Sequence, residues 1–149
     1  MIYKQYIHCK VSYGTYSMLC SFIYGSYLPN EIVELWDGLM QFSQNVRCSW
    51  IVLWDFNAVM SNRDRIGGMD VDETAASEFK NCIIDSNLLE LKFNGIDFTW
   101  SNNQSGHDRI WRKLDWCFVN DYWMEEWTES YCEKRSPGIS DHPPQSLFI

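Results

Sequence analysis

Apolar runs along the chain predict a protein of short strands with two longer helices between them. Residues 6–13 and 18–24 are strand-like, and the Gly-containing segment between them is typical of a hairpin turn. Residues 50–54, WIVLW, are continuously apolar, which indicates a strand covered on both faces. Further short strands are expected at residues 88–91, 97–101, 113–119 and 146–149.

Two segments carry apolar residues at helical spacing. The first follows LPN at residues 28–30, where Asn30 is the expected N-cap, and the second follows a polar loop at residues 62–74. A short third helix is expected at residues 121–127. Strands separated by helices, with short and long connections, predict a layered α/β sandwich. The residues expected to face the core are Ile32, Leu35, Trp36, Leu39 and Met40 in the first helix and Ala75, Ala76, Phe79, Cys82 and Ile83 in the second.

Composition agrees with a globular domain. The 149 residues are 46% hydrophobic and 16% aromatic, which is enough to build a core in one domain or part of one. No apolar run approaches the roughly 18–20 residues of a membrane span, so no membrane partner is expected. The N-terminus lacks the apolar region of a secretory signal. Six cysteines without a C-x-x-C pair indicate reduced, buried thiols. We therefore expect an intracellular protein, nuclear or cytoplasmic and not secreted.

The net charge of the chain restricts the classes of function further. The formal net charge is −8, with 20 acidic and 12 basic residues. This balance disfavours a stand-alone DNA-binding protein, because Lys and Arg supply most of the affinity for a phosphate backbone. It counts less against an enzyme whose acidic residues bind a cation. The sequence has neither a G-x-G-x-x-G motif nor a P-loop.

Polar residues at the ends of apolar runs are the candidates for chemistry. Asp55 follows the run WIVLW, and Asn57 points the same way if the extended conformation continues. Asp141 and His142 stand side by side before two prolines, and Asp115 lies inside an apolar run where an acid needs a partner. A histidine can exchange a proton near neutral pH. The alternative is that Asp55, Asn57 and His142 are ordinary turn residues.

Thr99 is equally open to two interpretations. Its hydroxyl could meet a phosphate oxygen, whereas the neighbouring Trp100 is expected in the core.

Six short motifs occur together in one order along the chain: SFIYGS, WIVLWDFNAVMS, RIGG, FTWSN, RIWRKLDWCFVND and PGISDHPP. In order and spacing they resemble the endonuclease/exonuclease/phosphatase superfamily, and most of all the endonuclease-like domains of plant non-LTR (LINE-type) retrotransposons. The resemblance implies a two-layer β-sandwich flanked by helices, that is, the four-layer α/β sandwich of this superfamily. It further implies Mg²⁺-dependent hydrolysis of DNA or another phosphodiester, and a reverse transcriptase domain as a partner in a longer parent chain.

The resemblance also assigns roles to residues. Asp55 and Asn57 match a pair that holds the attacking water and the phosphate. His142 matches the histidine at the scissile phosphate, and Asp115 matches the acid that orients it. Asp55 and Asp141 match residues at the metal centre. Tyr24, Thr99 and Ser140 match residues that contact the substrate.

Two departures from the family pattern affect the expected activity. Residues 1–149 match only the second half of such a domain, so the first half, with the glutamate that is the principal Mg²⁺ ligand, has no counterpart. Trp54 stands where the family usually has glycine. We therefore expect an N-terminally truncated domain, inactive as it stands. The alternatives are an active DNA endonuclease, or a non-catalytic interaction module that reuses the half-sandwich.

Overall fold

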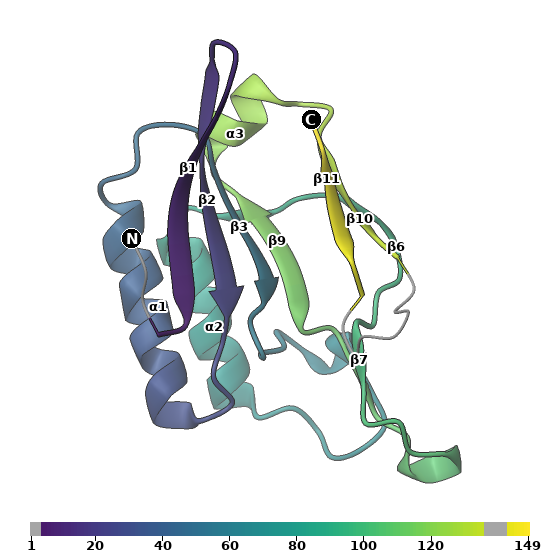
Figure 1. The fold of residues 1–149 in the computed structure, drawn as a ribbon. Coiled ribbons are helices and arrows are strands. Elements are labelled where there is room, and N and C mark those ends of the chain that lie inside the picture. Colours follow the sequence, from purple (N-terminus) through teal and green to yellow (C-terminus); the bar gives the residue numbers. More distant parts are fainter. Residues whose placement is uncertain (1–3, 136–142) are drawn as a thin grey trace.

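The main sheet has five strands. In the computed structural model, which describes residues 4–135 and 143–149, their order is β1 (Tyr6–Tyr13), β2 (Tyr16–Tyr24), β3 (Trp50–Asp55), β9 (Asp115–Val119) and β5 (Leu89–Glu90) (Figure 1). β2 and β3 are parallel because a helix crosses over between them, and the other pairs are antiparallel.

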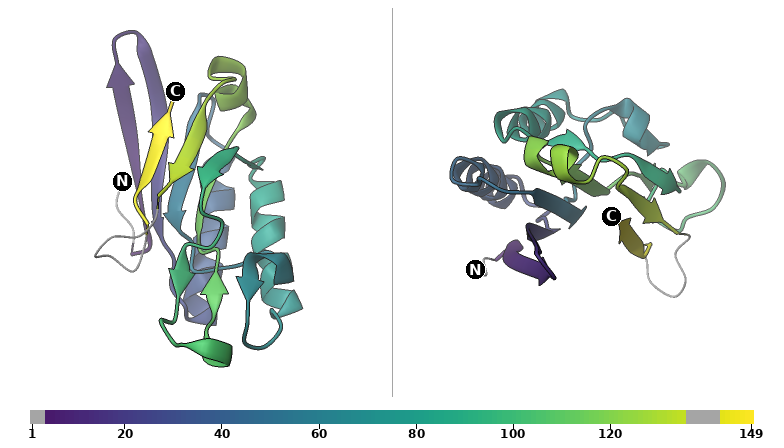
Figure 2. Two further views of the ribbon diagram at one scale, coloured as in Figure 1. Left: turned by 90° about the vertical axis from the view of Figure 1, so that its right-hand side faces the viewer. Right: turned by 90° about the horizontal axis from the view of Figure 1, so that it is seen from above.

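Helices α1 (Pro29–Ser43) and α2 (Glu73–Asp85) lie side by side against one face of this sheet (Figures 1 and 2). The predicted inward residues of both helices are buried or packed against this core, except for Ala75, which is exposed. Phe79 of α2 is at the centre, where its ring meets those of Trp36, Phe56 and Trp116. Aromatic side chains therefore fill most of the space between helices and sheet.

A second sheet packs on the opposite face. Its strands are β11 (Gln145–Phe148), β10 (Tyr131–Lys134) and β6 (Phe93–Gly95) in that order (Figure 2). Together with helix α3 (Asp121–Glu126) it encloses a second core, which contains Met18, Cys20, Ile51, Leu53, Leu91, Cys117, Val119, Trp123 and Cys132. The predicted sandwich with flanking helices is confirmed.

A small third sheet lies at one end of the main sheet. Its strands are β4 (Arg65–Ile66), β8 (Trp111–Arg112) and β7 (Trp100–Ser101). Two short 3₁₀ helices adjoin it, at Asn62–Asp64 and Gly106–Asp108. The segment predicted as a loop from residue 62 to 74 is thus partly regular, and its last residues already belong to α2.

The structure corrects the predicted start of the first helix. Leu28 and not Asn30 is the N-cap residue, and Pro29 begins the helix. Proline fits that position because its fixed φ suits a helix and its missing N–H would have no partner there. Strand β10 was not predicted. All six cysteines are free thiols, as predicted, but Cys9 and Cys48 are only half-buried. Within the described part of the chain, no helix combines the length and the apolar character that a membrane crossing requires.

Candidate functional site

Three of the candidate residues lie in one row across neighbouring strands. Strand register places Tyr24 of β2 beside Asp55 of β3, and Asp55 opposite Asp115 of β9. Side chains in register on adjacent strands share a face of the sheet. Asp55 and Asp115 are 8% and 4% exposed, whereas Tyr24 at the rim is largely exposed. Residues distant in the sequence therefore meet at one edge of the sandwich.

Asn57 belongs to a tight turn behind Asp55. Its backbone N–H donates to Asp55 Oδ1 over 2.8 Å, and its φ of +52° shows that the extended conformation has ended. Asn57 was expected to point the same way as Asp55 only if the extended conformation continued, and it does not continue. This is the Asx turn that was the alternative interpretation of the pair. The turn is joined to β2, because Gly25 N–H donates to the Asp55 carbonyl and Asn57 Nδ2 donates to the Gly25 carbonyl.

Gly25 allows that close approach. A Cβ atom at this position would lie 2.4 Å from the carbonyl oxygen of Phe56. Any side chain here would push the end of β2 away from the turn that holds Asp55 and Asn57.

Thr99 positions the start of β9. It is 2% exposed, and its Oγ1 accepts hydrogen bonds from the backbone N–H groups of Leu114 at 3.0 Å and Asp115 at 3.1 Å. The observed contacts of this hydroxyl are thus with the backbone that carries Asp115. Its role in substrate binding stays a prediction.

Two lysines near Asp115 were missed in the sequence. Lys134, 1% exposed, donates from Nζ to the Asp115 carbonyl over 2.8 Å, and Lys113 forms an ion pair with Glu90 at 2.7 Å. Burial lowers the pKa of Lys134, and the nearby charge of Lys113 lowers it further. Cys132 and Lys134 alternate with more exposed residues in YCEK, but the charge of the lysine concealed this strand pattern in the sequence.

Trp54 departs from the regular strand next to Asp55. Its φ is +91°, a conformation that a bulky side chain rarely adopts. Simple alternation would place it with Trp50 and Val52 on the helix-covered face, yet its indole packs on Phe22 of the opposite face with ring centroids 4.6 Å apart. The indole is 47% exposed. A large aromatic group therefore stands beside the row of Tyr24, Asp55 and Asp115.

Ser140, Asp141 and His142 lie outside the described residues, so their predicted roles are untested. The described residues on either side of that segment are joined, since Arg135 N–H donates to the Pro144 carbonyl. Lys134, which precedes that segment in the chain, contacts the backbone carbonyl of Asp115.

The carboxylate oxygens at the strand ends partly meet the ligand requirements of a hard cation such as Mg²⁺. Mg²⁺ prefers oxygen ligands and is usually bound by one or two carboxylates together with water and phosphate oxygens. Asp55 and Asp115, opposite each other at the strand ends, provide two carboxylates of that kind. Among residues 4–135 and 143–149, no three His, Cys, Asp or Glu side chains gather as a metal cluster. Asp55 therefore fits a Mg²⁺ site with few protein ligands, and Asp115 lies opposite it, where the acid that orients a histidine is expected.

Comparison with known proteins identifies the fold. No protein-family model matches the sequence, and no curated protein sequence gives a significant match. Solved structures do match. Beta toxin from Staphylococcus aureus aligns with a TM-score of 0.67 at 14% identity, covering 97% of this chain and 57% of its own. The endonuclease domain of TRAS1, a telomere-specific non-LTR retrotransposon, aligns with a TM-score of 0.62 at 15% identity, covering 97% of this chain and 63% of its own.

Sphingomyelinase C from Streptomyces griseocarneus aligns with a TM-score of 0.58 at 9% identity, covering 95% of this chain and 53% of its own. These proteins have the endonuclease/exonuclease/phosphatase fold, and this chain shares it. The chain spans between half and two thirds of the length of the solved chains that it matches.

Proposed function

We propose that this chain is the nuclease-like part of a retroelement-derived, Mg²⁺-dependent phosphodiesterase, and that residues 1–149 alone are inactive. The observation that carries the proposal is the row of Tyr24, Asp55 and Asp115, with the turn of Asn57 behind it. Its substrate is DNA, and a reverse transcriptase domain in a longer parent chain is its partner.

Each residue of the row has a part in the proposed reaction. Tyr24, exposed at the rim, donates its phenolic hydroxyl to a phosphate oxygen. Asp55 holds the attacking water, and the Asn57 turn fixes the orientation of its carboxylate. Asp115 orients His142 at the scissile phosphate. When bound, Mg²⁺ would offset the negative charge that develops on the phosphate and the leaving oxygen.

Two features support inactivity of the isolated chain. First, among the described residues the row contains only two acids that could bind a cation or a water, Asp55 and Asp115. Asp141, which lies outside the described residues, is the third predicted acid of the site. Loss of an electrostatic contribution to the transition state commonly lowers a rate roughly a hundredfold or more. Second, the exposed indole of Trp54 adjoins Asp55, and in the proposed site it would occupy space next to the phosphate.

The retroelement origin rests on two supports. The six sequence motifs resemble the LINE-type domains, and one of the matching solved structures is an endonuclease domain of a non-LTR retrotransposon. A lipid phosphodiester is the competing substrate, because another of the matching solved structures is a sphingomyelinase C.

Plasmid nicking tests the proposal. Supercoiled DNA is incubated in Mg²⁺ with this chain, with its His142→Ala variant, and with the chain fused to the first half of a related domain. We expect nicking by the fusion alone, lost again when the fusion carries His142→Ala. Nicking by the unfused chain that His142→Ala abolishes would overturn the inactivity. A fusion that cleaves sphingomyelin vesicles but not DNA would overturn the substrate.

A fusion that cleaves neither substrate is then tested with Trp54→Gly. Recovery of nicking would identify the indole as the obstruction. Continued inactivity would overturn the phosphodiesterase assignment.

A further inference from the structure

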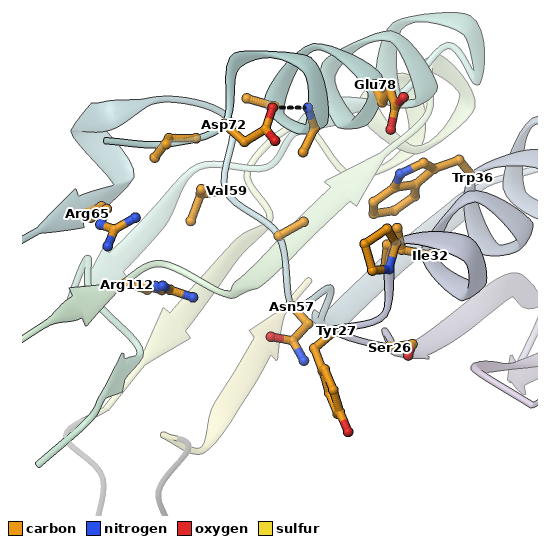
Figure 3. Close-up of a pocket in the computed structure, with 15 residues that line it drawn as sticks. Ser26, Tyr27, Ile32, Trp36, Asn57, Val59, Arg65, Asp72, Glu78 and Arg112 are labelled. Carbon is orange, nitrogen blue, oxygen red and sulfur yellow. Dashed lines mark hydrogen bonds between the residues drawn. The ribbon is translucent and has the colours of Figure 1, made fainter. Parts of the chain in front are cut away.

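A pocket of about 290 Å³ lies next to the candidate site, on the other side of the Asn57 turn. Its walls come from the N-terminal ends of α1 and α2, the turn after β3, and the β4–β8 pair (Figure 3). This volume is near the lower limit of small-molecule sites, roughly 300–1,000 Å³. The pocket is therefore large enough for one compact ligand group.

Two arginines stand together on one side of this pocket. Arg65 of β4 and Arg112 of β8 are cross-strand partners, and both line the cavity (Figure 3). Like charges directly opposite each other on adjacent strands are unfavourable. Burial lowers the pKa of Arg112, and the charge of Arg65 lowers it further. Binding of an anion between the two guanidinium groups would remove this repulsion.

No carboxylate in the described residues forms an ion pair with either arginine. Arg65 Nε donates to the Gly67 carbonyl over 2.8 Å, and the Arg112 guanidinium lies over the Trp100 ring at 5.6 Å. These contacts fix the direction of both side chains and leave N–H groups for a ligand. A guanidinium pair held in this way matches the geometry of a phosphate group.

The opposite side of the pocket is apolar. Ile32 and Trp36 of α1 form that wall, with Glu78 of α2 at its border (Figure 3). The Asp72 carboxylate at the top is engaged in capping α2, where it accepts from the N–H groups of Thr74 and Ala75. The pocket thus combines a cationic side with a flat apolar side. A ligand with one phosphate and a planar ring has the matching distribution of charge.

We propose that this pocket binds one nucleotide, with its phosphate between Arg65 and Arg112 and its base against Ile32 and Trp36. Asn57 connects the two sites, because its side chain lines the pocket while its backbone N–H is bonded to Asp55. In a bound strand, this nucleotide is a neighbour of the scissile phosphate. That second statement rests on the proposed function, whereas binding of a free nucleotide does not.

Nucleotide titration without Mg²⁺ tests the pocket. The indole N–H signal of Trp36 is followed by NMR during addition of deoxyadenosine 5′-monophosphate, deoxyadenosine or inorganic phosphate. We expect the monophosphate to shift this signal and to bind more tightly than either of the other two compounds. A charged hydrogen-bond pair contributes about 1.5–3 kcal/mol, so Arg65→Gln and Arg112→Gln should each weaken binding by roughly tenfold or more. Circular dichroism confirms that each variant is folded.

Arg63→Gln is the matched control, because Arg63 is exposed, lies two residues from Arg65 and undergoes the same change of charge. It should change the affinity by less than about twofold, as expected of a screened surface charge. Equal weakening by all three variants would mean that net charge alone attracts the nucleotide, and would overturn the pocket. So would inorganic phosphate that binds as tightly as the nucleotide.

The two proposals can fail separately. A short single-stranded oligonucleotide that competes with the monophosphate, with the same dependence on Arg65 and Arg112, places the pocket on the path of a strand. Failure of the oligonucleotide to compete would restrict the pocket to free nucleotides and overturn the strand statement. Arg-dependent binding together with a fusion that cleaves neither DNA nor sphingomyelin, with or without Trp54→Gly, would overturn the phosphodiesterase and leave the pocket. Nicking by the fusion without nucleotide binding would overturn the pocket and leave the phosphodiesterase.

Discussion

The two faces of the main sheet are covered to very different degrees. The face toward α1 and α2 is sealed by interlocking aromatic rings around Phe79. On the other face, the second sheet covers β3 and β9, while Ile7, Val11 and Trp54 are between 40% and 47% exposed. The helix-covered core contains more of the large buried aromatic side chains, whereas the opposite face leaves apolar side chains available for further contacts.

Replacement of Phe79 by alanine should have the largest effect. The ring is fully buried among Trp36, Phe56, Trp116 and Phe118, so its loss leaves a cavity in the sealed core. We expect a decrease of about 3–5 kcal/mol in the free energy of unfolding. Urea unfolding followed by far-UV circular dichroism measures it. A decrease below about 1 kcal/mol would contradict the central role of this core.

Acid should weaken the sealed face through His8. This histidine is buried, stacks on Phe42 at 3.6 Å, and its Nδ1 lies 2.6 Å from Ser21 Oγ. Burial lowers the pKa of His8 to about 4, below its ordinary value of 6.5. Between these two values the unfolded chain binds more protons than the folded one, so stability is present near neutral pH and is lost as the pH falls from 6.5 toward 4.

The measurement for His8 is a series of urea unfolding curves between pH 5 and pH 7. The His8→Gln variant should show a weaker dependence on pH than the unaltered chain. His107→Gln changes an exposed histidine and is the matched control. Identical slopes for the unaltered chain and His8→Gln would refute the assignment.

Trp54→Gly should stabilise the open face slightly. Glycine adopts a φ of +91° without steric cost, whereas an L side chain in the left-handed region costs about 1–2 kcal/mol. The lost packing on Phe22 offsets part of this gain. Trp54→Ala loses the same packing and keeps the strain, so we expect Gly to be more stable than Ala by about 1 kcal/mol. The denaturant midpoints of the two variants measure this difference in stability. A higher midpoint for Trp54→Ala than for Trp54→Gly would disprove the backbone strain at residue 54.

Equal truncations on the two faces should have unequal effects. Val52→Ala removes methyl groups from the sealed core and should cost about 2 kcal/mol. Val11→Ala removes the same groups from the open face and should cost less than about 0.5 kcal/mol. Similar losses in the two variants would indicate that something covers Val11 in solution, which sedimentation at several protein concentrations would then detect.

The sequence predicted the elements whose own pattern is strong. Strand β3 is a continuous apolar run, and α2 has regular helical spacing, so both were found near their true limits. Strand β10 was missed because the buried Lys134 breaks its apolar pattern, and that burial depends on Asp115 from a distant strand. The conformation of Trp54 was equally hidden, since alternation alone assigns its side chain to the helix-covered face.

Part of the candidate site could be predicted from the sequence alone. Tyr24 and Asp55 could be singled out because each ends an apolar run and lies in a family motif, and Asp115 because an acid inside an apolar run needs a partner. Strand register brings the three together. The sequence left extension and an Asx turn open for Asn57, because the turn is held in part by its contact with the end of β2. Arg65 and Arg112 belong to the motifs RIGG and RIWRKLDWCFVND, but their pairing could not be predicted, because only two very short strands unite them.

The place of β9 inside the main sheet determines when that sheet can be completed on the ribosome. β3 pairs with β9, which is synthesised about 60 residues later. At bacterial and eukaryotic elongation rates this is a delay of roughly 3 to 12 seconds. During that interval β1, β2 and β3 can already be paired, but the far edge of β3 offers open hydrogen-bonding groups to any other nascent chain. Codon choice or chaperone contact between residues 56 and 114 would therefore influence the yield of folded protein more than the same intervention after residue 119.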